Sequence, residues 1–191
     1  MATVPASYIS PEEYLERERK AETRSEYIRG EIFAMAGASI RHGRIVRNLV
    51  ATLDAALAGG PCEVFATDLR LAVNSAGMYT YPAVMVVCSD PIVIDKHNDT
   101  ITNPIVILEV LSDSTNYDRG QKFQYYRTLQ SLQEYFTISQ DEMHVERYTR
   151  QQNGQWLLTE FDQSSEPIEL QSLTVTLDVA DIYRRVDFTS Q

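Results

Sequence analysis

Two unbroken apolar runs mark the centre of the chain. The first is Pro82-Ala83-Val84-Met85-Val86-Val87-Cys88, and the second covers residues 104–111. Strands that are apolar on both faces are typical of a sheet interior covered on both sides. The runs therefore predict two adjacent central strands, joined by a polar loop from Asp95 to Asn103.

Helical spacing predicts a long helix between Ile40 and Leu57, because Val46, Leu49, Val50, Leu53 and Leu57 recur at intervals of three and four. Gly59-Gly60 ends it.

A shorter helix starts at Ser10, where Ser10 caps, Pro11 fits the first turn and Glu13 closes a capping box. It is expected to run to about Glu22. Two further helices are predicted over residues 118–129 and 177–185.

Alternation in the second half of Cys62–Val73 predicts one half-buried strand over this range, with Leu69 and Leu71 on one face and Asp68 and Arg70 on the other. Residues 25–35 are expected to form a strand or a hairpin, and further strands are expected over residues 134–139, 143–150 and 156–161. The order of elements indicates an α/β (mixed α+β) fold, a mixed sheet flanked by helices, in one domain spanning residues 1–191.

Composition narrows the class of protein. Hydrophobic content of 43% and charged content of 23% are ordinary for a globular chain. No apolar run approaches the roughly 20 residues of a membrane span, so no membrane contact is expected.

Cys62 and Cys88 are expected to be reduced thiols, which suits the cytoplasm. Without a CxxC or Cys/His pattern, zinc is not expected. The net charge of −10 argues against a broad nucleic-acid-binding surface but not against a local basic groove.

Glu109 stands inside the second apolar run, between Leu108 and Val110. A buried carboxylate is costly unless a charged partner uses it. One interpretation is a structural ion pair with an arginine such as Arg119. The other is a ligand to Mg²⁺, with the Val110 carbonyl as a neighbouring oxygen donor.

Lys122 follows Glu109 through the polar turn Ser112–Thr115, on a predicted helix. It is either a solvated helix lysine or a cation that stabilises charge on a phosphodiester transition state. Asp68 and Glu31 either face solvent or point into the same cleft.

A basic group, Arg41, His42, Arg44 and Arg47, lies at the start of the long helix. His42 taken alone fits a surface or capping residue. The group as a whole is the best local patch for contacting the phosphates of DNA.

The chain resembles the Uma-two family of endonucleases, which have the restriction-endonuclease-like fold and a PD-(D/E)XK-type site. The resemblance covers nearly the whole chain in order, and residues 103–135 carry its most specific part. The matching segments are Glu26–Glu31, Ser39–Arg44, Thr67–Arg70, Tyr81-Pro82, Asn103–Ser112, Ser114-Thr115, Tyr117–Lys122, Ser131–Tyr135 and Ile182-Tyr183.

This resemblance implies a central mixed sheet and a Mg²⁺ or Mn²⁺ site held by the aspartate of the PD pair and a strand glutamate. By position the glutamate is Glu109. Leu111 occupies the position where the lysine usually stands. The chain therefore resembles nucleases whose lysine has moved to the following helix, and Lys122 is the residue that matches it. Glu31 matches an acid near the metal cleft, and a homodimer is expected by the same resemblance.

The chain departs from the pattern at Ala83, where the family has the aspartate after Tyr81-Pro82. Alanine offers no ligand oxygen, so weak metal binding and impaired activity are expected. Three interpretations stay open: a natural inactive member, a deliberately inactivated variant, or an enzyme in which Asp68 or Glu31 substitutes.

Two functions compete. One is metal-dependent hydrolysis of DNA phosphodiester bonds; the other is a non-catalytic binding or assembly protein on the nuclease fold. A small-molecule enzyme has little support, because the chain has no Gly-rich phosphate loop and no GxSxG motif.

Overall fold

The computed structural model describes residues 8–35, 37–111, 118–163 and 165–189. The predicted turn Ser112–Thr115 lies outside the described residues. In the part that is described, no helix is both long enough and apolar enough to cross a membrane.

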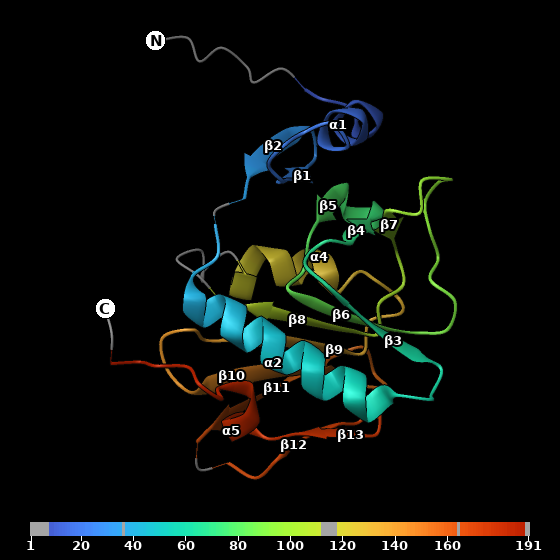
Figure 1. The fold of residues 1–191 in the computed structure, drawn as a ribbon. Coiled ribbons are helices and arrows are strands. Elements are labelled where there is room, and N and C mark those ends of the chain that lie inside the picture. Colours follow the sequence, from blue (N-terminus) through green and yellow to red (C-terminus); the bar gives the residue numbers. More distant parts are fainter. Residues whose placement is uncertain (1–7, 36, 112–117, 164, 190–191) are drawn as a thin grey trace.

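A six-stranded mixed sheet with the order β11-β10-β9-β8-β6-β3 forms the larger layer (Figure 1). Its strands are β3 (Cys62–Ala66), β6 (Val84–Cys88), β8 (Val106–Val110), β9 (Glu134–Ile138), β10 (His144–Arg150) and β11 (Trp156–Asp162). The predicted central strands are confirmed, since β6 and β8 are antiparallel neighbours and each has a paired strand on both sides.

A five-stranded sheet with the order β2-β1-β5-β4-β7 forms the second layer. Its strands are β1 (Ser25–Ile28), β2 (Glu31–Ala34), β4 (Arg70–Val73), β5 (Met78–Thr80) and β7 (Thr100–Ile101), with the short 3₁₀ turn η1 (Asn74–Ala76) between β4 and β5. Helix α1 (Pro11–Glu18) lies against this sheet, and Ser10 caps it by accepting a hydrogen bond from the Glu13 amide. The helix is one turn shorter than expected.

Helix α2 (Ile40–Leu57) has the predicted bounds and lies across the six-stranded sheet (Figure 1). Its buried side chains Ile45, Leu49 and Leu53 pack in one core cluster with Val86 and Leu108 of the sheet. Helix α5 (Val179–Ile182) and the small hairpin of β12 (Ile168–Leu170) and β13 (Val175–Leu177) close the same core. The hairpin was not predicted.

The opposite face of the six-stranded sheet packs on the five-stranded sheet and on a helical segment. This segment consists of the π-helical turn η2 (Asp118–Lys122) followed by α4 (Phe123–Tyr126). The second core cluster joins Met85 and Ile107 of the large sheet to Leu71 and Met78 of the small one, and Tyr126 of α4 belongs to it as well. Side chains that project from this face of β6 and β8, such as Met85 and Ile107, are therefore enclosed between the two sheets.

The predicted strand ending at Val73 is wrong in two respects. The chain turns after Ala66, so that β3 joins the large sheet and β4 joins the small one. All of β4 is buried, including Arg70, which was expected on a polar face. The Arg70 guanidinium donates to the Tyr81 hydroxyl and the Thr100 hydroxyl, so its polar atoms have partners inside the protein.

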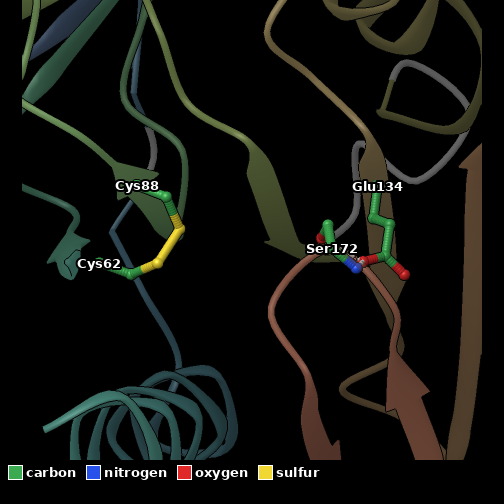
Figure 2. Close-up of a disulfide and its surroundings, with 4 residues drawn as sticks. All are labelled: Cys62, Cys88, Glu134 and Ser172. Atoms are coloured by element: carbon green, nitrogen blue, oxygen red, sulfur yellow. Dashed lines mark hydrogen bonds between the residues drawn. A yellow bond between two sulfur atoms is a disulfide. The ribbon is translucent and has the colours of Figure 1, made fainter. Parts of the chain in front are cut away.

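The two cysteines were expected to be reduced thiols, and this prediction is wrong. Cys62 and Cys88 form a disulfide between β3 and β6 (Figure 2). They lie directly opposite each other in the antiparallel register, a pairing that spacing along the chain does not reveal. The cysteines therefore no longer support a cytoplasmic location.

Candidate active site

Glu109 projects from β8 toward the space between the two sheets. Alternation along the strand places it on the same face as Ile107, which belongs to the inter-sheet core. The residue is only 6% exposed, so its carboxylate depends on protein partners.

The Lys122 ammonium group is the main partner of Glu109. Its Nζ lies 3.0 Å from Glu109 Oε1, 2.9 Å from Glu26 Oε1 and 3.6 Å from Asp118 Oδ1. The four side chains come from β1, β8 and η2, and we call them the carboxylate–lysine cluster. It brings together the two residues that the sequence singled out first.

The π-helical turn explains how Lys122 reaches this position. Lys122 and Asp118 are four residues apart, so they lie on the same side of the helical segment, and both are buried. Such turns widen a helix locally and recur at functional sites.

Electrostatics keep Lys122 protonated. Burial alone would lower its pKa, but the carboxylates of Glu109, Glu26 and Asp118 outweigh that effect and hold the pKa well above its ordinary value. The amine therefore acts as a fixed cation and not as a base.

Two further contacts fix the Glu109 carboxylate. The Tyr126 hydroxyl donates to Oε1 at 2.7 Å, and the Ala83 amide donates to Oε2 at 3.2 Å. Burial, together with the nearby carboxylates of Glu109 and Glu26, raises the pKa of Tyr126 well above its usual value, so it stays a donor. The Arg119 alternative is not what the structure shows, because Arg119 pairs with Glu146 at 3.1 Å.

The structure does not bring Asp68 or Glu31 into the cluster. The Asp68 side chain is 82% exposed and pairs with Arg24 at 2.6 Å. Glu31 is exposed at the start of β2. Neither placement supports a replacement for the missing ligand at Ala83.

The predicted basic group begins α2, and its members differ in surroundings. Burial lowers the pKa of His42, and the negative charge of Glu109 opposes the shift, which places this imidazole within electrostatic reach of the cluster. Arg41 donates to the Asp187 carbonyl at 2.8 Å. Arg44 is half-buried, and Arg47 is exposed.

Arg47 also lines an open hollow of about 270 Å³ together with Arg184 and Arg185. Among the described residues, none of these three arginines has a carboxylate within ion-pair distance. The hollow is therefore a local basic surface on an acidic chain. Sequence analysis had found Arg47 but not the two arginines after α5.

Sequence analysis missed Glu26 and Asp118 as well. The i, i+4 spacing of Asp118 and Lys122 was a usable signal for a shared helix face. The sequence held no such signal for Glu26, because its approach to Lys122 depends on the packing of β1 against β8 across the two sheets.

Comparisons with known proteins identify the family of the chain. The sequence model of the Uma2 family, described as "Putative restriction endonuclease", matches residues 11–180. Two proteins of Synechocystis sp. (strain PCC 6803) are similar over nearly their whole length. "Uncharacterized protein sll1609" is 39% identical and covers 92% of this chain and 99% of its own, and "Uncharacterized protein slr1290" is 37% identical with 97% of each chain covered.

A solved structure shares the fold. It is the crystal structure of "a putative nuclease belonging to DUF820" from Anabaena variabilis, with a TM-score of 0.76. The likeness covers 92% of this chain and 97% of that one, at 22% sequence identity. At this identity the solved structure shows a shared fold, and the match of the sequence model over residues 11–180 shows that the chain belongs to the Uma2 family.

Proposed function

We propose that this protein is a DNA endonuclease that depends on Mg²⁺ or Mn²⁺ and is weakened by alanine at position 83. The observation that carries the proposal is the 3.0 Å contact between Lys122 Nζ and Glu109 Oε1 at the boundary of two sheets. Family membership supports the reaction class, and the contact supplies the strand glutamate and helix lysine that such a site needs.

The chemistry of the donors fits a hard divalent cation. Three carboxylates face one ammonium group, and oxygen ligands are what Mg²⁺ prefers. Glu109 and the Val110 carbonyl would hold the ion. When bound, Mg²⁺ or Mn²⁺ polarises a phosphate oxygen and lowers the pKa of a water molecule.

Lys122 would serve as a positioned positive charge. Because its pKa is held well above the ordinary value, it can stabilise negative charge that develops on the phosphate. Tyr126 would orient Glu109 through its hydroxyl group without touching the substrate.

Position 83 decides how strong the site is. Val84 pairs with Leu108 in the antiparallel register, so residue 83 extends the ladder opposite Glu109, and its amide already donates to that carboxylate. An aspartate there would face the ion from the neighbouring strand. With alanine, Glu109 lacks this second anchor, and weak metal binding follows.

The DNA contacts would be local. Arg44 and Arg47 offer positive charge on the first turns of α2, and Arg184 and Arg185 extend it across the hollow. Phosphate binding by such a patch does not require a positive net charge. A homodimer and a cytoplasmic location also stay predictions.

A non-catalytic DNA-binding or assembly protein is the second candidate. Ala83 is the observation that favours it, since the same residue that weakens the metal site leaves the fold and the basic patch intact.

The test compares metal titration by calorimetry and plasmid nicking for the chain, Ala83→Asp, Ala83→Asn and Ala83→Asp with Glu109→Ala. Asparagine matches aspartate in size without its charge, so it controls for steric effects in a buried position. The combined variant controls for contaminating nuclease, and circular dichroism checks that each variant folds.

We expect tighter Mg²⁺ binding and faster nicking for Ala83→Asp alone. Equal affinity and nicking in all four proteins would refute position 83 as a ligand site. Strong cleavage by the unaltered chain that is lost on Asp68→Ala would instead assign the ligand role to Asp68. If none of the four proteins nicks the plasmid and DNA binding is retained, the result would favour the non-catalytic candidate.

A further inference from the structure

A row of polar side chains continues from Glu109 across the large sheet. In the strand register Glu109 pairs with Thr137, Thr137 with Glu146, and Glu146 with Glu160. Neighbouring strands lie about 4.8 Å apart, so Glu146 stands about 10 Å from Glu109 and is not part of the carboxylate–lysine cluster. Sequence analysis gave no role to this part of the sheet.

His144 joins the far end of this row. Its Nε2 lies 3.7 Å from Glu146 Oε1 and 3.6 Å from Glu160 Oε1, and the three potential ligand atoms all fall within 4.8 Å of one another. We call these residues the histidine–glutamate trio.

The spacing within the trio suits a shared metal ion better than direct hydrogen bonds. Both distances exceed the 2.7–3.2 Å of an ordinary N–H···O bond. Tetrahedral ligands at 2.0–2.2 Å from an ion are separated from each other by about 3.3–3.6 Å. The two distances from the imidazole nitrogen to the carboxylate oxygens are close to this separation.

Hydrogen bonds to one carboxylate oxygen of Glu146 hold its side chain in place, and the other oxygen can coordinate a metal ion. Its side chain is only 10% exposed. Oε2 accepts hydrogen bonds from Arg119 at 3.1 Å, Thr137 at 2.8 Å and Tyr148 at 3.2 Å. Among the described residues Oε1 accepts no hydrogen bond, and it faces His144. Hydrogen bonds to the outer atoms of a ligating carboxylate are what orient it toward a metal.

Two other features favour a cation at this point. Glu146 and Glu160 lie directly opposite each other on antiparallel strands, where like charges destabilise the pair. The backbone of His144 is fixed by Tyr183, whose hydroxyl accepts from the His144 amide at 3.1 Å and donates to its carbonyl at 2.7 Å. A divalent ion would offset the repulsion without moving either strand.

We propose that His144, Glu146 and Glu160 bind a divalent transition-metal ion of the Zn²⁺ type, with water completing the coordination. An imidazole and two carboxylates form a cysteine-free ligand set suited to Zn²⁺ and similar ions. The absence of a Cys/His pattern, which argued against zinc from the sequence, does not bear on such a set. The site is separate from the Mg²⁺ or Mn²⁺ site of the proposed function.

The experiment measures Zn²⁺ binding by calorimetry and the visible absorption of Co²⁺, with untagged protein so that no added histidines bind the probe. The variants are His144→Ala and Glu160→Gln, each with a partly exposed side chain, so the fold should survive. His97→Ala, on an exposed loop outside the trio, is the matched control. Glu109→Gln separates the trio from the carboxylate–lysine cluster.

We expect one ion per chain, a loss of affinity of about 100-fold or more for His144→Ala, and a loss of about 10-fold or more for Glu160→Gln. His97→Ala should bind like the unaltered chain, and Glu109→Gln should retain the ion held by the trio. Unchanged binding by folded His144→Ala, loss of binding by Glu109→Gln alone, or no binding by the unaltered chain would each overturn the proposal. None of these readouts depends on nuclease activity.

Discussion

Tyr126 donates a hydrogen bond of 2.7 Å to Glu109, and both side chains are buried between the two sheets. Removing the hydroxyl in Tyr126→Phe takes one donor from a buried carboxylate. We expect a loss of about 1–3 kcal/mol in the free energy of unfolding, measured in urea. Tyr125→Phe is the control, because among the described residues that hydroxyl accepts a hydrogen bond from the exposed Gln121 side chain alone. Equal losses in both variants would contradict the role given to Tyr126.

Removing the cation of the carboxylate–lysine cluster should lower the free energy of unfolding more than Tyr126→Phe does. Lys122→Met leaves the carboxylates of Glu109, Glu26 and Asp118 buried around an apolar side chain, and we expect a loss of about 3–5 kcal/mol. Adding Glu109→Gln to Lys122→Met should recover part of that loss. The same substitution at the exposed Lys96 should change little. Strictly additive effects of the two changes would mean that Lys122 and Glu109 are not coupled.

Charge reversal on α2 tests the proposed DNA contact. Arg44→Glu combined with Arg47→Glu should weaken binding to a short DNA duplex and flatten the dependence of binding on salt, because fewer counterions are released. Arg17→Glu, in an exposed residue of α1 that pairs with Glu13, changes charge elsewhere and serves as the control. If the double variant keeps both affinity and salt slope, this part of α2 does not contact DNA.

His42 should make stability depend on pH. Its folded-state pKa is lowered by burial, so the unfolded chain takes up this proton more readily than the folded one. The contribution of neutral His42 to the free energy of unfolding is therefore present above about pH 6.5. It is lost as the pH falls through the lowered folded-state pKa. His42→Gln should reduce the loss of stability between pH 7 and pH 5, measured by urea denaturation.

Much of the fold followed from local patterns. The bounds of α2 came from helical spacing, and the placement of β6 and β8 inside the sheet came from their apolar character, because each pattern is visible within a single segment. The split of β3 from β4 did not follow. The turn after Ala66 sends the chain into a different sheet, and alternation of side chains is the same in either sheet.

The site was predictable to a similar extent. Glu109 and Lys122 were found because a carboxylate in an apolar strand and a lysine shortly after it are visible in one segment. Glu26 was not, and Glu31 was chosen instead, because only the packing of two sheets shows which acid of residues 26–31 faces Lys122. The same limit explains the disulfide, whose cysteines are 26 residues apart and meet through strand register.

The Lys122 ammonium group contacts one carboxylate from each sheet, Glu26 on β1 and Glu109 on β8, at nearly equal distances. It can keep both ion pairs only while the sheets stay at their present separation. A phosphate group that enters between the sheets would compete for the same amine and draw it from one of them. Ligand binding at the site and the separation of the two sheets are then coupled. A ligand of Lys122 would slightly change the distance between the sheets across the whole domain.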